Sequence, residues 1–259
     1  MNVLILGTTG FLGSHLQRTL NCAQNSVLSI PHSPTRQWLV SFFAAQKVDW
    51  VINCMGAYQK EGYERVMEGN LYVPMLVILT AAESGVKNFI NMNTSLPEYF
   101  NFYSFCKSEL GNFGKFCNKQ YDVNFYNLLL EMFYSADEPE DRFLSSIVRK
   151  LRKDECIELT EGTQYRDLVH VEDICTTVEF LMNQNLLGYY DIPLGTGEKH
   201  TIRETVEFLK KNMKSKSELC FGAVPMRKNE PDCIADMSFL RSLGYQSIYS
   251  WEDGLKTLL

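Results

Sequence analysis

The sequence predicts an α/β protein with a doubly wound parallel sheet and a smaller C-terminal lobe. Short apolar segments alternate with longer amphipathic ones along the first half of the 259-residue chain. The short segments are apolar throughout, which is typical of parallel strands buried on both faces. A glycine-rich turn joins the first strand to the first helix, as in Rossmann-type domains.

The first half of the chain contains five predicted strands with helices between them. Helices are expected after Phe11, over residues 35–46 and 70–85, and around Tyr103; the strands are expected at 3–7, 27–30, 49–56, 87–92 and 124–130. Because a helix separates each strand from the next, the strands should run parallel, with helices on both faces of the sheet.

The pattern loosens after residue 130. Residues 168–182 are predicted to form a strand and a helix that return to the main sheet, whereas the glycine-rich residues 188–200 are expected to be a loop. Thr-Ile-Arg-Glu at 201–204 and Ser-Trp-Glu-Asp at 250–253 are capping boxes, so a helix should begin at each. We interpret this half as a smaller lobe assembled from separated segments.

Composition excludes several classes of protein. A net charge of −6 argues against a general nucleic-acid binder. No apolar run reaches the roughly 18 residues of a membrane span, and the chain starts directly with a strand, so a cytoplasmic protein is predicted. The eight cysteines show neither C-x-x-C spacing nor a matching histidine pair, so we expect buried free thiols in a reducing compartment and no metal site.

The turn after the first strand predicts a dinucleotide site. Gly7 permits the tight turn, Gly10 lets the backbone approach a pyrophosphate, and Gly13 lets the helix pack closely on the strand. The helix N-terminus then offers N–H groups to the phosphates. Further predicted cofactor contacts are Thr9, Phe11, Leu12 and, at the end of the third strand, Gly56.

The end of the second strand favours NADPH over NADH. An NAD site usually has an acidic residue about 20 residues after the glycines, but none follows this strand. His32, Ser33 and Arg36 stand there instead and would suit a 2′-phosphate. The alternative is that Arg36 merely begins a solvated helix.

Tyr103 and Lys107 form a candidate catalytic pair. They lie four residues apart, so both side chains should share one face of a helix. An ammonium group close to a phenol lowers its pKa, and such a tyrosine can pass a proton to a carbonyl oxygen. The same spacing also occurs by chance in many helices, so the pair gains weight only beside the glycine turn.

Taken together, these features resemble the extended short-chain dehydrogenase/reductase family, in its branch that acts on nucleotide sugars. Residues 165–174, 189–204 and 227–245 resemble three further motifs of that branch. Within it, residues 88–110 and 128–143 look most like the 4-ketoreductases of the CDP-abequose synthase type.

The resemblance implies roles for individual residues. Tyr103 would donate a proton to the sugar carbonyl, and Lys107 would bind the nicotinamide ribose and lower the pKa of the tyrosine. Thr94 would hydrogen-bond the substrate oxygen, with Ser95 as the alternative. Two arginines would grip the diphosphate of the nucleotide sugar, or else form surface salt bridges: Arg166 and Arg227.

The resemblance also implies an organisation and an activity. Residues 1–130, with 165–183 returning to them, would form the NADP-binding domain, and 131–259 the discontinuous nucleotide-sugar-binding lobe. Helices within 61–84 and 104–119 would form a homodimer interface. The implied reaction is NADPH-dependent reduction of the C4 ketone of a nucleoside-diphosphate 4-keto-6-deoxyhexose, in deoxysugar biosynthesis for a surface polysaccharide such as the lipopolysaccharide O-antigen.

Two other functions remain open. A nucleotide-sugar 4-epimerase would use the same residues with a tightly bound NAD, although the missing acidic residue after the second strand speaks against it. A dinucleotide-sensing protein without catalysis would not need the tyrosine, lysine and threonine together.

Overall fold

The computed structural model describes residues 1–259, apart from the side chain of Gln59. The chain folds into two compact units, here called the N-terminal unit (residues 1–130 and 175–193) and the C-terminal unit (131–174 and 194–259). The segment that rejoins the N-terminal unit is therefore 175–193, whereas residues 165–183 were predicted to do so.

The N-terminal unit contains a six-stranded sheet in the order β10–β5–β4–β3–β1–β2. The strands are β1 (Asn2–Leu6), β2 (Ser26–Leu28), β3 (Trp50–Asn53), β4 (Asn88–Thr94), β5 (Asn124–Leu130) and β10 (Tyr189–Leu194). β1 pairs in parallel with β2 on one side and β3 on the other. The order therefore reverses at β1, and the carboxyl ends of β1 and β3 border the crevice where such folds bind nucleotides.

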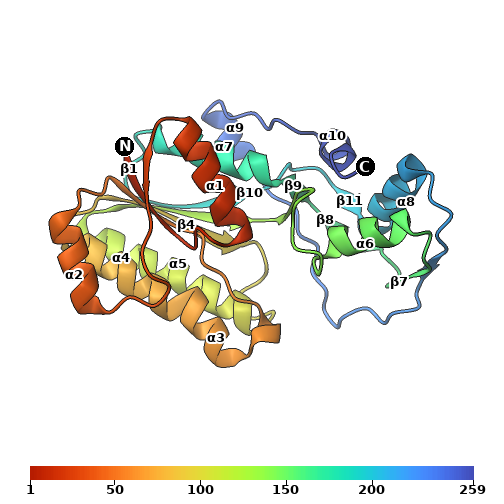
Figure 1. Ribbon diagram of the computed structural model, residues 1–259, viewed down its shortest axis with the longest axis horizontal. Coiled ribbons are helices and arrows are strands. Elements are labelled where there is room, and N and C mark those ends of the chain that lie inside the picture. Colours follow the sequence, from red (N-terminus) through yellow and green to blue (C-terminus); the bar gives the residue numbers. More distant parts are fainter. The chain divides into compact units, whose positions relative to one another are not determined.

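Helices cover both faces of this sheet (Figure 1). They are α1 (Phe11–Cys22), α2 (Arg36–Ala45), α3 (Tyr63–Met67), α4 (Val73–Glu83) and α5 (Phe102–Tyr121), with a 3-10 turn η1 (Gln59–Glu61) and a one-turn π-helix η2 (Glu68–Tyr72). Apolar residues of α2, α4 and α5, such as Leu39, Val77 and Leu110, belong to one core cluster with strand residues such as Leu4, Phe89 and Phe125. These observations confirm the doubly wound α/β fold.

Residues 188–200 are not simply a loop, as expected, because 189–194 form strand β10 at the edge of the sheet. Ile192 and Leu194 are buried whereas Asp191 is exposed, an alternation that the glycines around the strand obscured. The carbonyls of Gly188 and Leu194 accept hydrogen bonds from Phe125 and Glu131. Even-numbered residues therefore face β5, and Pro193, which has no N–H, meets the free edge where proline is tolerated.

The C-terminal unit is built from short elements. Its strands are β6 (Met132–Tyr134), β7 (Ile157–Leu159), β8 (Tyr165–Arg166), β9 (Leu168–His170), β11 (His200–Thr201) and β12 (Leu219–Phe221). Its helices are α6 (Phe143–Arg152), α8 (Ile202–Met213), α9 (Ser238–Ser242) and α10 (Trp251–Lys256), and α7 (Val171–Met182) begins here and continues in the N-terminal unit. α6, α8 and α10 contribute to its apolar core; examples are Leu144, Ile147, Leu151, Val206, Leu209 and Leu255.

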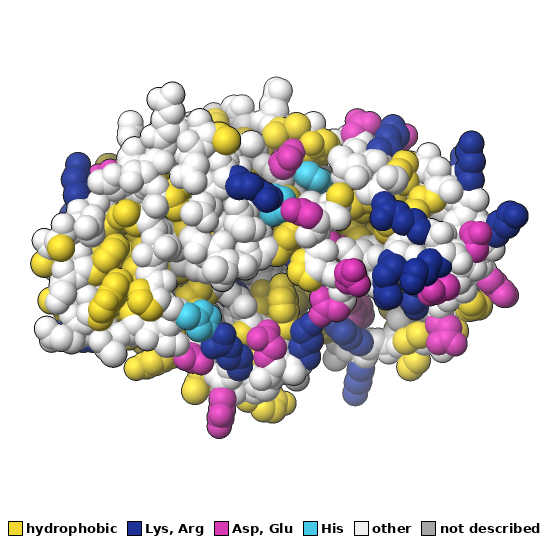
Figure 2. Space-filling model, viewed as in Figure 1, with side chains coloured by type: hydrophobic (Ala, Val, Ile, Leu, Met, Phe, Trp, Pro, Cys, Tyr) yellow, Lys and Arg dark blue, Asp and Glu magenta, His cyan; other side chains and the backbone are white. Residues whose placement is uncertain are grey.

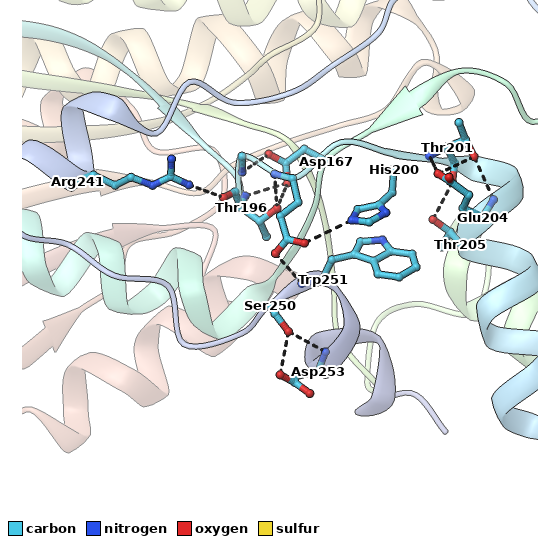
Figure 3. Close-up of polar contacts among 12 residues, drawn as sticks. Asp167, Thr196, His200, Thr201, Glu204, Thr205, Arg241, Ser250, Trp251 and Asp253 are labelled. Carbon is cyan, nitrogen blue, oxygen red and sulfur yellow. Dashed lines mark hydrogen bonds and ion pairs between the residues drawn. The ribbon is translucent and has the colours of Figure 1, made fainter.

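Each of these strands forms a two-stranded sheet with one partner. β6 pairs with β9, β7 with β12 and β8 with β11. The expectation that the strand at 168–170 returns to the main sheet was therefore wrong: its parallel partner is β6. Both predicted helix starts are confirmed, because the hydroxyls of Thr201 and Ser250 accept the N–H groups of Glu204 and Asp253 (Figure 3).

Two further expectations concerned the membrane and the cysteines. No helix in the part of the chain that the structure describes is both long and apolar enough to span a bilayer. All eight cysteines are free, but only four of them are buried. The sulfur atoms of Cys156 and Cys220, beside the β7–β12 pair, lie 3.1 Å apart.

Candidate active site

The glycine turn after β1 has the geometry of a phosphate-binding loop. Gly7 adopts a φ of +83°, and its carbonyl accepts the N–H of Gly10 at 3.0 Å. A Cβ on Gly13 would lie 2.0 Å from the Gly7 oxygen, so only glycine lets α1 start this close to the strand. α1 begins at Phe11 without a capping side chain at Gly10, which suits an anionic group at the helix N-terminus.

A buried asparagine shapes the neighbouring turn after β3, where Gly56 lies. The Asn70 side chain accepts the N–H of Ala57 at 3.3 Å and donates to the Ala57 carbonyl at 2.7 Å. Asn70 belongs to η2 and is fully buried. Sequence reasoning missed it, because nothing near Asn70 in the sequence indicates a partner 13 residues earlier.

The residues expected to bind the 2′-phosphate have acidic and basic neighbours. Ser33 donates to the Glu68 carboxylate at 3.0 Å, and Arg36 forms an exposed ion pair with Glu83 at 2.7 Å. The hydrogen bond from Ser33, followed by that from Arg65, lowers the pKa of Glu68. Arg65 also lies 2.5 Å from the ring nitrogen Nε2 of His32, and sequence reasoning had not singled it out.

The start of α5 places Tyr103 and Lys107 one turn apart. Asn101 and Ser104 form a reciprocal capping box that fixes this helix end. The Lys107 ammonium lies 6.0 Å from the centroid of the Tyr103 ring, which also stacks on Tyr58 at 5.6 Å. The structure thus brings the predicted pair together.

Lys107 is a buried cation held by backbone carbonyls. Its side chain is nearly inaccessible, and Nζ donates to the carbonyl oxygens of Met55 and Met92, each at 2.8 Å. Burial lowers the pKa of Lys107 to about 8, although the thiol of Cys54 opposes that shift. The two carbonyls supply the hydrogen-bond acceptors that a buried ammonium requires.

Thr94 and Ser95 stand at the carboxyl end of β4, just beyond Met92. The Thr94 hydroxyl accepts the N–H of Leu96 at 3.3 Å, and the Ser95 N–H donates to the carbonyl of Leu130 at 3.0 Å. Both residues line a pocket of about 250 Å³ in the N-terminal unit. The end of strand β4 therefore brings Thr94 and the adjacent Ser95 close in sequence to Met92, whose carbonyl holds Lys107.

In the C-terminal unit, Arg166 and Arg227 line the same pocket, of about 320 Å³. Arg166 is buried and forms an ion pair with Glu230, while Arg227 is exposed. Positive side chains also gather over this unit in Figure 2, among acidic ones. Arg166 therefore does form a salt bridge, as the alternative expected, but this ion pair is largely buried rather than on the surface.

Two oxygens of this pocket have unmet hydrogen-bonding capacity. Gln164 Oε1 and Glu230 Oε2 are buried without a hydrogen-bond partner among the described residues. Buried acceptors of this kind call for donors. Hydroxyl or amino groups of a ligand would supply them, and neither residue was predicted from the sequence.

The strand that carries Arg166 is anchored by the next residue, Asp167 (Figure 3). Its fully buried carboxylate accepts the N–H groups of Thr196 and Gly197, each at 2.8 Å, and that of Ala235 at 3.2 Å. Two loops distant in the sequence are thereby tied to one carboxylate beside Arg166.

Comparison with known proteins accounts for this combination of features. Residues 3–190 match the model of the NAD dependent epimerase/dehydratase family. The chain belongs to this family. Its membership agrees with the resemblance to extended short-chain dehydrogenases/reductases inferred from the motifs.

Relatives that match nearly the whole chain include two bacterial enzymes. The chain is 24% identical to CDP-abequose synthase of Salmonella muenchen, over 99% of this chain and 96% of that protein. It is 22% identical to CDP-abequose synthase of Yersinia pseudotuberculosis, over 99% and 97%. These similarities confirm the resemblance drawn from residues 88–110 and 128–143.

Solved structures show the same fold at low sequence identity. The UDP-glucose 4-epimerase of Thermotoga maritima superposes with a TM-score of 0.89 at 18% identity, covering 100% of this chain and 97% of that one. The GDP-mannoheptose C4 reductase of Campylobacter jejuni, solved with NADP bound, superposes with a TM-score of 0.82 at 20% identity, covering 99% and 96%.

Proposed function

We propose that the protein is an NADPH-dependent reductase of the C4 ketone of a nucleoside-diphosphate 4-keto-6-deoxyhexose. Its product would enter deoxysugar synthesis for a surface polysaccharide such as the O-antigen. The observation that carries the proposal is the pairing of Tyr103 with the buried ammonium of Lys107. Similarity to CDP-abequose synthases along nearly the whole chain supports it.

The N-terminal unit fits a nicotinamide dinucleotide. There is no room for a Cβ at Gly13, and α1 starts without a capping side chain. Both features suit a pyrophosphate lying against the backbone. The pyrophosphate would be held by Gly7, Thr9, Gly10, Phe11, Leu12 and Gly13, while Gly56 lines the site and Lys107 binds the nicotinamide ribose. When bound, the reduced dinucleotide supplies the hydride that adds to C4.

The preference for NADPH is supported by the residues after β2. No acidic residue follows this strand to accept ribose hydroxyls, whereas His32, Ser33 and Arg36 do follow it. The Arg36–Glu83 ion pair is exposed and so contributes only about 0–1 kcal/mol. A 2′-phosphate can therefore displace Glu83 from the guanidinium at little cost.

Tyr103 and Lys107 on α5 would carry out the proton transfer. An isolated phenol, with a pKa of roughly 10, is a poor acid at neutral pH. The neighbouring Lys107 ammonium stabilises the phenolate, so Tyr103 can give its proton to the C4 oxygen. Thr94, or Ser95 in its place, would hydrogen-bond that oxygen. Because the pKa of Lys107 is lowered to about 8, its charge is present at pH 7 and is lost above pH 8.

Arg166 and Arg227 would bind the diphosphate of the substrate. Guanidinium groups bind phosphate oxygens through paired hydrogen bonds. Arg227 is exposed and available, whereas Arg166 must share its guanidinium with Glu230. The unpaired oxygens of Gln164 and Glu230 would then accept hydrogen bonds from the nucleoside.

One observation favours a second function, 4-epimerisation with a bound NAD. The carboxylates of Glu68 and Glu83 lie against Ser33 and Arg36, where they would repel a 2′-phosphate. The cofactor retained by the purified protein separates the two functions, because an epimerase of this branch keeps its NAD. A non-catalytic sensor would be indicated if no substrate turned over.

The decisive experiment is incubation with NADPH and a panel of CDP-, dTDP-, GDP- and UDP-linked 4-keto-6-deoxyhexoses, with products identified by NMR. We expect one member to be reduced at C4 with equimolar NADPH oxidation. Tyr103→Phe should lower kcat by roughly 100-fold or more while NADPH affinity barely changes. Tyr99→Phe is the matched control, because Tyr99 is 81% exposed and lies in the turn that precedes α5. Near-normal turnover of Tyr103→Phe would remove that residue from its role.

We further propose a homodimer formed through α3, η2, α4 and α5. These elements expose large apolar side chains, among them Tyr63, Met67, Tyr72 and Phe116. Burying such side chains against a second copy would remove apolar area from water. Light scattering should give twice the chain mass at micromolar concentration, and Phe116→Lys should shift the protein towards the monomer. A wild-type monomer would contradict this assembly.

A further inference from the structure

A row of buried side-chain amides crosses the N-terminal sheet. Asn53 on β3, Asn91 on β4 and Asn127 on β5 are register partners on adjacent strands. Asn53 donates to Asn91 and Asn91 donates to Asn127, each at 2.8 Å, and Asn127 donates to the Asp191 carboxylate at 2.7 Å. The three asparagines are at most 2% exposed. We call Asn53, Asn91, Asn127 and Asp191 the amide row.

The amide row lies on the face of the sheet that α5 covers. Apolar core residues Val51, Phe89 and Phe125 precede the three asparagines by two positions, so they project from the same face. Helix α5 approaches the row at Gly111, where a Cβ would come 2.8 Å from Asn127 Nδ2. No side chain of α5 separates the helix from the amides at this point.

Placing carboxamides in an apolar layer carries an energetic cost. Buried amides are tolerated only when their donors and acceptors are paired, and apolar side chains would otherwise serve the core better. Asn91 meets this condition through one donated and one accepted hydrogen bond. A role beyond filling the core would explain why polar groups occupy this layer.

The amide row connects to both carbonyls that hold Lys107. At its first member, Asn53 Oδ1 accepts the N–H of Met55 at 3.1 Å, and the Met55 carbonyl accepts Lys107 Nζ. At its centre, Asn91 directly precedes Met92, whose carbonyl is the second acceptor of that ammonium. Asn93 also donates to Asn127 at 3.1 Å, so residues on both sides of Met92 are fastened to the row.

We propose that the amide row is a positioning element for Lys107. By fixing the turn after β3 and the end of β4, it holds the carbonyls of Met55 and Met92 at the spacing that keeps the ammonium beside Tyr103. The catalytic consequence rests on the proposed function, but the positioning itself does not. Asn53 and Asn91 are the members that act on the two carbonyls.

Strands β4 and β5 also contain a second asparagine pair, which provides a control for the amide row. Asn124 donates to Asn88 at 2.9 Å and accepts the N–H of Gly188 at 3.0 Å, so it has the same numbers of donated and accepted bonds as Asn91. This second pair joins β4 to β5 three residues before the amide row, on the opposite face. It contributes to register without touching the residues that hold Lys107.

The test compares Asn91→Leu with the matched control Asn124→Leu. The titration of Lys107 is followed by NMR of protein labelled with ¹³Cε-lysine, with the resonance assigned by its loss in Lys107→Met. A Cys54→Ser background removes the thiol that interacts with Lys107, while the Tyr103 phenol is common to all variants. Lost carbonyl contacts disfavour the ammonium, so Asn91→Leu should lower the midpoint by about half a pH unit or more, and Asn124→Leu should leave it unchanged.

Asn53→Ala serves as a second variant in case Asn91→Leu does not fold, and the same decrease is expected from it. In the reductase assay, Asn91→Leu or Asn53→Ala should lower kcat by about 10-fold or more, with Asn124→Leu within about 2-fold of the parent. An unchanged or raised midpoint in the row variants, or an equal decrease in Asn124→Leu, would overturn the proposal. Because the titration needs neither substrate nor cofactor, an absent reductase activity would count against the proposed function alone.

Discussion

The buried ammonium of Lys107 should make the stability of the protein depend on pH. An unfolded lysine has a pKa of 10.5, whereas burial lowers that of Lys107 to about 8. Between these values the unfolded chain binds more protons than the folded one, so the free energy of unfolding rises with pH. Below about pH 8 the lysine is protonated in both states, and the folded state bears the full free-energy cost of burying its charge. About 2.5 pKa units at 1.36 kcal/mol each correspond to roughly 3 kcal/mol.

Lys107→Met removes the titrating group while keeping an unbranched side chain. We expect the difference in unfolding free energy, wild type minus variant, to increase by roughly 2–3 kcal/mol between pH 7 and pH 10.5. Taking the difference cancels the contributions that the other titrating tyrosines, lysines and cysteines make to the unfolding free energy in this pH range. Urea unfolding followed by circular dichroism at half-unit pH intervals measures it.

The control for this experiment is Leu110→Ala. Leu110 is buried on the same helix and does not titrate, so its cost should be constant across the pH range. A wild-type-minus-Lys107→Met difference that is equally flat would refute the reasoning, because the lysine would then be as well solvated in the folded state as in the unfolded chain.

Four further outcomes test other parts of the molecule. Arg36→Ala should weaken NADPH binding by about 10-fold or more and leave NADH nearly unchanged, since a charged hydrogen bond contributes about 1.5–3 kcal/mol; equal losses would contradict the 2′-phosphate assignment. Arg227→Ala should raise KM for the nucleotide sugar with kcat less affected, as expected for a contact shared by ground and transition states; a change in Tm alone would point to a purely structural arginine. Gly13→Ala would place a Cβ 2.0 Å from the Gly7 oxygen, so it should cost about 1–3 kcal/mol of stability and impair dinucleotide binding; a normal Tm together with normal affinity would show that the turn has more room. Glutathione disulfide should convert Cys156 and Cys220, 64 residues apart, into an intramolecular disulfide worth about 4 kcal/mol at most, visible as a higher Tm; two thiols that still react with Ellman's reagent would contradict this.

Features that depend on neighbours in the sequence could be predicted. The glycine turn, the capping residues Thr201 and Ser250, and the spacing of Tyr103 and Lys107 all involve residues within one or two turns of each other. Their local geometry follows from short-range sterics and hydrogen bonds. The alternation of apolar strands with helices predicted the doubly wound sheet for the same reason.

Features that depend on distant partners could not be predicted. Arg36 meets Glu83 47 residues later, and Asn91 meets Asn127 36 residues later. A single sequence contains no local signal for either contact. Strand β10 was missed because its alternation of buried and exposed residues is short and is obscured by the glycines around it.

Pro193 has a consequence for the behaviour of the chain at high concentration. It lies on the outer strand of the sheet, and the hydrogen bonds of Gly188 and Leu194 direct its nitrogen away from β5. An exposed edge strand is a template on which another chain can add a strand and start aggregation. The missing N–H interrupts that template near the carboxyl end of the edge strand. We therefore expect Pro193→Val to fold but to be more prone to form fibrils on prolonged incubation than the wild-type protein.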